Sequence, residues 1–174
     1  MLVSELKKSI REVPDFPKPG INFYDVSTLF RNREAFGATV NRMVERFRGD
    51  PIDALAGIEA RGFVLAGAMA YALGVGMILV RKSGKLPHRT ESEPYALEYG
   101  EAKVEIHRDA VEPGQRIVIV DDVLATGGTA AAAARIVQRL GGRVDGFAFM
   151  VELGFLGGRR LLPPASVFSL MQYD

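Results

Sequence analysis

The segment 116–134 limits the fold more than any other, because it joins an apolar strand, two acids, a glycine turn and an alanine-rich helix. Residues 116–120, RIVIV, form the strongest strand pattern in the chain, and Asp121 and Asp122 are expected to close that strand. The following helix is predicted over 127–140, with Gly141 and Gly142 as its stop signal. A buried strand that leads through a short turn into a helix is typical of a parallel α/β sheet.

The rest of the chain continues this alternation. Apolar residues recur three and four positions apart in segments that predict helices, at 2–11, 34–47 and 62–73. Short apolar runs predict strands at 52–58, 76–80, 143–151 and 167–170. No repeat or linker divides the 174 residues, so we expect a single α/β domain over 1–174 in which helices flank a central parallel sheet.

Two polar stretches interrupt this pattern. Residues 81–94 are rich in Lys, Arg, Ser, Glu and Pro, which predicts a long loop, and loops of that length tend to be functional. Residues 95–107 alternate weakly and predict a hairpin or flap. Within the loop we expect Arg89, Glu91 and Glu93 to be ordinary solvated charges.

Composition and charge exclude several classes of protein. With 22 basic and 21 acidic residues the net charge is +1, which argues against a strongly basic nucleic-acid binder. The absence of cysteine excludes disulfides, thiolate metal sites and a cysteine nucleophile. The uncharged stretch 63–80 is interrupted by Gly74 and Gly76, so a buried helix and strand explain it better than a membrane span. With no apolar signal segment at its start, the chain is expected in the cytoplasm.

The turn after the strongest strand has the chemistry of a phosphate site. Gly127 and Gly128 let the backbone approach an anion, and the N–H groups at a helix start favour a phosphate. Thr126 and Thr129 add hydroxyl donors, whereas the spacing fits neither a Walker loop nor a dinucleotide fingerprint. The two acids before this turn suit ribose hydroxyls, directly or through Mg²⁺, and positive charge that develops on the sugar.

Segment 118–129 resembles the phosphoribosyl-diphosphate signature of the type I phosphoribosyltransferases. Four further segments are similar to those of the adenine phosphoribosyltransferases within that family: FPKPGI at 16–21, EARGF at 59–63, RKSGKLP at 81–87 and LEYG at 97–100. This resemblance implies the type I phosphoribosyltransferase fold, with a flexible flap loop and with residues 1–33 including a hood over the base. It implies transfer of the 5-phosphoribosyl group from 5-phosphoribosyl 1-diphosphate to adenine, giving AMP and pyrophosphate.

The resemblance also implies a role for each matched segment. Ala125, Thr126, Gly127, Gly128 and Thr129 would hold the 5′-phosphate, Asp121 and Asp122 would face the ribose, and Arg61, Arg81 and Lys85 would bind the diphosphate. Asn22, Phe23, Tyr24 and Leu153 would surround the base, Glu98 would act as general acid or base, and Tyr99 would orient the substrate or close the loop. The Glu59–Ala60 peptide is a candidate for a cis bond in this superfamily.

Several further expectations follow from the resemblance. Mg²⁺ would be held mainly by the substrate, and the enzyme would be a homodimer with no nucleic-acid or membrane partner. Tyr24 stands where the family commonly has Arg, which leaves another purine such as xanthine open as the substrate. A non-catalytic regulator that senses a ligand with the same fold is a second alternative. His88 has no carboxylate or His neighbour at ligand spacing, so it is not expected to bind metal, and His107 is expected to be an exposed residue of the flap.

Overall fold

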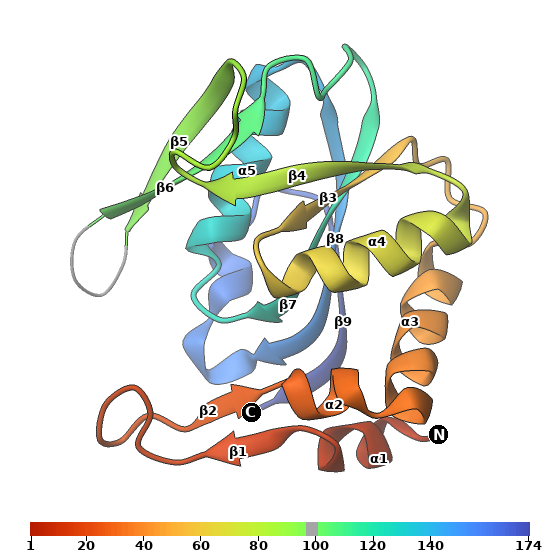
Figure 1. Cartoon of the computed structure of the whole chain (residues 1–174), viewed down its shortest axis with the longest axis vertical. Helices are drawn as coiled ribbons and strands as arrows, with labels where there is room; N and C mark the ends of the chain where they lie inside the picture. The colour runs from red at the N-terminus through yellow and green to blue at the C-terminus, as the bar shows by residue number, and fades with distance from the viewer. Residues whose placement is uncertain (97–100) are drawn as a thin grey trace.

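A computed structural model describes residues 1–96 and 101–174 of the chain. A seven-stranded sheet forms its centre (Figure 1). In spatial order the strands are β5 (Thr90–Ala96), β6 (Glu101–His107), β4 (Gly76–Lys82), β3 (Ala54–Ile58), β7 (Arg116–Leu124), β8 (Arg143–Leu153) and β9 (Ser166–Tyr173). The five strands from β4 to β9 run parallel, as expected, and the β5–β6 hairpin continues the sheet antiparallel at one edge.

Helices cover both faces of this sheet, and each face has its own apolar core. One core contains residues of α1 (Val3–Lys8), α2 (Ser27–Arg31), α3 (Arg33–Phe47) and α4 (Arg61–Leu73), and the other contains α5 (Gly128–Arg139). Along β7, Val118 and Val120 join the first core while Ile117 and Ile119 join the second. Alternate side chains of one strand therefore fill both cores, which explains why RIVIV is apolar throughout.

The first helix is shorter than its periodicity suggests. The helix predicted over 2–11 ends at Lys8, where the Ser9 N–H donates to the Leu6 carbonyl at 2.9 Å. The chain then forms β1 (Arg11–Val13), which pairs antiparallel with β2 (Phe23–Asp25) in a separate two-stranded sheet. In Figure 1 this small sheet lies across the carboxyl ends of β7 and β8, next to the end of β9.

The two acids do not end their strand, so that prediction was wrong. β7 continues to Leu124 because β8 stays paired with it, with Asp121 opposite Phe149 and Leu124 opposite Glu152. Pairing with β3 on the other side stops at Val120. The last four residues of β7 therefore extend beyond β3. At Asp121 and Asp122 the edge of β7 that faced β3 is free to contact other groups.

Half of the polar stretch 81–94 is strand rather than loop. β4 runs through Lys82 and β5 begins at Thr90, so the hairpin starts five residues earlier than predicted. Glu93 is not a free surface charge, because its carboxylate pairs with Arg135 at 2.6 Å and with Arg139 at 2.9 Å on α5. Glu91 also pairs with Arg139, at 3.0 Å. These ion pairs hold the hairpin against α5.

The remaining predictions differ from the structure mainly at element ends. The uncharged stretch 63–80 forms α4 and β4, as predicted, and in the described part of the chain no helix has the length and apolarity needed to span a membrane. Two short 3₁₀ helices that the sequence did not predict, η1 (Gly154–Leu156) and η2 (Gly158–Leu161), connect β8 to β9.

Candidate active site

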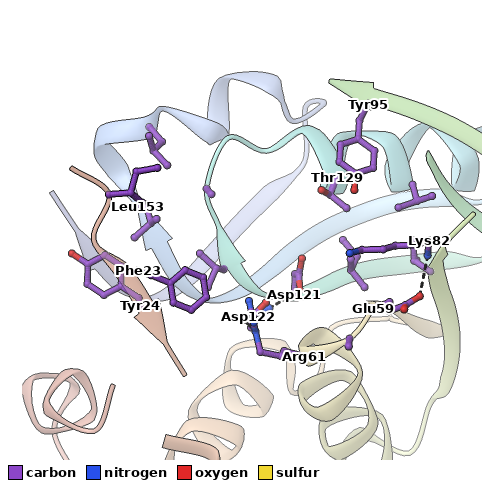
Figure 2. A pocket seen from close by; sticks show the side chains of 18 of the residues that line it. Phe23, Tyr24, Glu59, Arg61, Lys82, Tyr95, Asp121, Asp122, Thr129 and Leu153 are labelled. Carbon is purple, nitrogen blue, oxygen red and sulfur yellow. Dashed lines mark hydrogen bonds and ion pairs between the residues drawn. The ribbon is translucent and has the colours of Figure 1, made fainter. Parts of the chain in front are cut away.

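A cavity of about 550 Å³ lies at the carboxyl ends of the parallel strands, beside β2 of the small sheet (Figure 2). Carboxyl ends of parallel strands are where open α/β sheets bind ligands. All strands of the central sheet except β9 contribute to the lining of the cavity, together with β2, the start of α4, the loop after β7 and η1. The lining residues are Ile21, Asn22, Phe23, Tyr24, Ile58, Glu59, Ala60, Arg61, Val80, Lys82, Tyr95, Val104, Asp121, Asp122, Val123, Ala125, Thr129, Leu153 and Leu156.

The predicted phosphate loop connects β7 to α5. Gly127 has φ of +83° and its carbonyl accepts the Ala131 N–H at 2.9 Å, so it starts the helix from a conformation that favours glycine. A Cβ at Gly127 would lie 2.3 Å from the carbonyl oxygen of Gly158 on η2. Ala125 and Thr129 line the main cavity, and Thr126, Gly127 and Gly128 line an adjoining hollow of about 70 Å³. The structure thus brings all five predicted residues to one helix start.

The acid pair lies beside this loop, and the two carboxyls have different surroundings. Asp122 is only 5 % exposed and forms an ion pair with Arg61 at the start of α4. Asp121 accepts the Asp122 N–H at 2.8 Å. Desolvation, followed by the neighbouring charge of Asp122, raises the pKa of Asp121 well above its ordinary value of 3.8, and Arg61 opposes this only weakly. One site therefore holds an acid paired with Arg61 next to an acid that resists ionisation.

The start of α4 packs directly against these acids. A Cβ at Gly62 would lie 2.9 Å from Oδ1 of Asp121, so only glycine lets the helix approach this closely. The Glu59–Ala60 peptide immediately before it is cis, as the resemblance implied. Arg61 is placed by this turn so that it reaches Asp122 and lies 5.9 Å from the ring centre of Phe23.

Glu59 accepts hydrogen bonds from three basic residues in β4 and just after it. Its carboxylate, 9 % exposed, accepts hydrogen bonds from Arg81 Nε at 3.2 Å, from the Lys82 N–H at 3.0 Å and from Lys85 Nζ at 2.5 Å. Desolvation acts against ionisation, but the bonds from Lys85 and Lys82 outweigh it and lower the pKa of Glu59. Of the three basic residues only Lys82 lines the cavity.

The sequence analysis did not select Lys82 as a site residue, although the alternation of side chains along β4 could have identified it. Val80 and Lys82 both line the cavity, because alternate residues of a strand face the same side. The side-chain period of two therefore singles out Lys82, whereas Arg81 lies between these two positions. Arg81 and Lys85, which the resemblance assigned to the diphosphate, are instead paired with Glu59 at the cavity rim.

The opposite wall of the cavity is apolar and aromatic. Phe23 and Tyr24 of β2 face Leu153 at the end of β8 (Figure 2). Asn22 donates through Nδ2 to the Glu12 carboxylate at 2.8 Å, which connects the two strands of the small sheet. The Tyr24 ring lies against Tyr173, with ring centres 4.3 Å apart. The predicted base-binding residues therefore lie at the same end of the cavity, with Phe23 and Tyr24 on one side and Leu153 on the other.

A second feature that the sequence did not reveal holds the loop after β8. Arg159 forms two hydrogen bonds with Glu152, Nε at 2.6 Å and Nη2 at 2.7 Å, and these bonds lower the pKa of Glu152. This pair closes the segment that carries Leu153, Leu156 and Gly158. Glu152 belongs to β8 and Arg159 to η2, so the periodicity of a single helix or strand could not have paired them.

The LEYG segment at 97–100 lies outside the described residues, and with it the predicted acid or base Glu98 and its neighbour Tyr99. The end of β5 that leads to this segment carries Tyr95, which lines the cavity. Tyr95 also lies close to the phosphate loop, since a Cβ at Gly128 would be 3.6 Å from its ring.

Comparison with known proteins agrees with this geometry. The family model described as "Phosphoribosyl transferase domain" matches residues 27–154, so the chain belongs to the phosphoribosyl transferase family. The adenine phosphoribosyltransferase of Desulfitobacterium hafniense is 53 % identical over 99 % of this chain and 100 % of the relative. That of Acidobacterium capsulatum is 54 % identical over 97 % of this chain and 93 % of the relative.

Solved structures give the same result. The adenine phosphoribosyltransferase of Thermoanaerobacter pseudethanolicus superposes with a TM-score of 0.96 at 48 % identity, covering 99 % of this chain and 100 % of the other. The enzyme of Saccharomyces cerevisiae, solved with an imino-altritol bisphosphate and adenine, gives 0.91 at 41 % identity, covering 97 % of each chain. Within its family this chain is therefore an adenine phosphoribosyltransferase, an enzyme that converts adenine and 5-phosphoribosyl 1-diphosphate into AMP and pyrophosphate.

Proposed function

We propose that the 550 Å³ cavity is where this reaction takes place, with the 5′-phosphate on residues 125–129 and adenine against Phe23 and Leu153. The observation that carries the proposal is that one cavity is lined by Ala125 and Thr129 at a helix start, by an acid pair and by an aromatic wall. Each matches one part of the donor and acceptor: the phosphate, the ribose and the purine. A helix N-terminus with exposed N–H groups favours the phosphate.

The acid pair would act on the ribose. Asp122, which pairs with Arg61, is suited to stabilise positive charge as the bond from the sugar carbon to the diphosphate lengthens. Asp121, whose pKa is raised, is suited to exchange hydrogen bonds with a ribose hydroxyl. Arg61 and Lys82 would stabilise the negative charge of the departing pyrophosphate by donating charge-assisted hydrogen bonds to it. Attack by adenine N9 from the opposite side inverts the configuration at that carbon.

Arg81 and Lys85 would also contact the diphosphate, by exchanging Glu59 for the ligand. This part of the proposal rests on the resemblance and on their position beside Lys82. A bound diphosphate offers several oxygens with more negative charge than the Glu59 carboxylate. The partner exchange would therefore bring two more cations to the leaving group as it departs.

Glu98 is proposed as the group that handles the proton at the imidazole side of adenine. The proposal rests on the LEYG match alone, because residues 97–100 are not described. Tyr99 is proposed to orient the substrate on the same basis. A carboxyl near N7 would make N9 a better nucleophile by controlling that proton.

Mg²⁺ fits the residues present as a metal held mainly by substrate. Among the described residues no group of three His, Cys, Asp or Glu side chains is placed to hold a metal ion. Mg²⁺ is commonly bound by one or two carboxylates together with substrate phosphates and water, and Asp121 and Asp122 provide such carboxylates beside the sugar position. When bound, the ion would neutralise charge on the diphosphate.

A homodimer is proposed from an exposed apolar face. Tyr71 is 92 % exposed and Val64, seven residues earlier, projects from the same side of α4. Leu79 on the adjacent β4 is also exposed. Light scattering after size exclusion tests this proposal: Tyr71→Arg should give a monomer mass, and Leu2→Arg, at an exposed position outside α4, should leave the dimer intact. A monomeric wild-type protein would contradict it.

A base panel tests the proposed substrate and distinguishes the alternatives. The protein is incubated with 5-phosphoribosyl 1-diphosphate, Mg²⁺ and adenine, guanine, hypoxanthine or xanthine in turn, and pyrophosphate release is measured. We expect release with adenine and at least about a hundredfold less with the others. A site that hydrogen-bonds the C6 amine of adenine would reject guanine, hypoxanthine and xanthine, which carry an oxygen at that position. Release with xanthine but not adenine would contradict the assignment, and salt-sensitive nucleic-acid binding without turnover would favour a regulator.

Two expectations from the sequence stay predictions. One is that residues 1–33 include a hood over the base, and the other is a cytoplasmic location, which cell fractionation would test.

A further inference from the structure

Tyr173, near the end of β9, contacts both walls of the proposed base site. Its ring centre lies 4.3 Å from that of Tyr24, with the ring planes 43° apart. Its backbone is the register partner of Leu153, at the last pair of the β8–β9 ladder. Tyr24 and Leu153 both line the cavity, whereas Tyr173 does not. Tyr173 is thus the residue through which the β1–β2 sheet contacts the strand end that carries the opposite wall.

Contacts from α1 and β8 also hold Tyr173 in place. Lys7 on α1 places its Nζ 4.7 Å from the ring centre and donates a hydrogen bond to the Gln172 carbonyl. A cation above an aromatic face is attracted by the ring, and an aromatic pair adds to this. Gln172 in turn extends Nε2 toward Glu152, at 3.4 Å. The ring is therefore held between the small sheet and α1, on a strand end tied to β8.

The geometry points to Tyr173 as a positioning residue that sets the separation between Phe23-Tyr24 and Leu153, and so the affinity for the purine. In the described part of the chain, Tyr173 has no contact with the phosphate loop, whose Thr129 lies across the cavity from Phe23 in Figure 2, and the inference uses no property of the acid pair. The inference rests on the proposed placement of adenine between these walls. It predicts an effect on one substrate only: binding of the base should weaken while binding of 5-phosphoribosyl 1-diphosphate should not.

Steady-state kinetics of Tyr173 variants test this. In Tyr173→Leu the aromatic pair and the cation contact are lost while apolar bulk remains, and we expect the KM for adenine to rise about five- to tenfold, since such ring contacts are worth on the order of 1 kcal/mol. The KM for the diphosphate donor should change less than twofold. Tyr173→Phe retains both ring contacts and should stay within about twofold of wild type for both substrates. The hydroxyl is not part of the argument.

Phe168 supplies the matched control, because it lies on the same strand and forms a different aromatic pair, with Phe47 at 6.2 Å. Phe168→Leu should lower the melting temperature without raising the KM for adenine selectively. If Tyr173→Leu raised both KM values equally, or if Phe168→Leu gave the same adenine effect, Tyr173 would have only a structural role. An unchanged adenine KM in a folded Tyr173→Leu protein would also overturn the inference. Failure of wild type to use adenine would instead overturn the proposed function.

A double-mutant cycle with Tyr24→Leu gives a second readout that does not depend on the stability of one variant. If Tyr173 acts through Tyr24, the two changes in adenine KM should not add, and the double variant should resemble the single variants. Additive effects would show that Tyr173 does not act through that ring, and would contradict the inference.

Discussion

Gly127→Ala tests whether the loop after β7 needs glycine both for its backbone conformation and for its contact with η2. An added Cβ would meet the Gly158 carbonyl oxygen at 2.3 Å, far inside van der Waals contact. Adopting φ of +83° costs a residue with a Cβ about 1–2 kcal/mol, and overpacking costs about 1–3 kcal/mol more. We therefore expect a loss of about 2–5 kcal/mol in the free energy of unfolding, measured by urea denaturation.

Gly114 separates the two contributions. It has φ of +80° but nothing within 4 Å of the position its Cβ would take, so Gly114→Ala should lose only the conformational part, about 1–2 kcal/mol. The backbone N–H of Gly127 is also one of the proposed donors to the 5′-phosphate. Gly127→Ala should therefore raise the KM for 5-phosphoribosyl 1-diphosphate by at least about tenfold, the effect of losing one hydrogen bond to a charged group. Gly114→Ala should not. Equal losses of stability and equal KM values in the two variants would refute the reasoning.

Three further predictions follow from the charged groups. Since the pKa of Asp121 is raised, the native state holds a proton that the unfolded chain releases above its ordinary value of 3.8, and stability is lost as the pH rises through the raised value. Asp121→Asn should therefore melt a few degrees higher than wild type near neutral pH, with the difference shrinking toward pH 4, while kcat falls; a lower melting temperature at neutral pH would contradict this. The lowered pKa of Glu152 has the opposite sign: its contribution is complete above its ordinary value of 4.5 and is lost as the pH falls through the lowered value, so wild type and Glu152→Gln should differ in stability at pH 7 and converge in acid, and a difference independent of pH would exclude this pair as the cause. Glu98→Gln should reduce kcat by about a hundredfold or more with a smaller effect on the donor KM, as expected for lost proton transfer, and unchanged turnover would remove Glu98 from that role.

Local pattern predicted those parts of the fold that depend on one element at a time. The parallel sheet followed from RIVIV and its neighbours, because strands buried on both faces must be apolar throughout. The phosphate turn followed from its glycines, since the backbone at Gly127 has a positive φ that favours glycine. Helix α3 was predicted within one residue, since Asn32 caps it and apolar spacing defines its buried face.

Features that depend on tertiary pairing could not be predicted. β7 continues past Asp122 only because β8 remains beside it, and no property of residues 121–124 reports that partner. The charged residues of β5 indicated a loop, yet Glu93 is satisfied by Arg135 and Arg139, about 40 residues away in sequence. The Tyr24–Tyr173 contact joins positions at opposite ends of the chain. Such long-range contacts override local propensity.

The central claim is the position of the 5′-phosphate on residues 125–129. A crystal structure of the protein with AMP tests it directly. We predict phosphate oxygens within about 3 Å of the backbone N–H groups of residues 126–129, the ribose hydroxyls beside Asp121 and Asp122, and the adenine ring between Phe23 and Leu153. A nucleotide bound elsewhere, with the turn after β7 free of phosphate, would contradict the central claim.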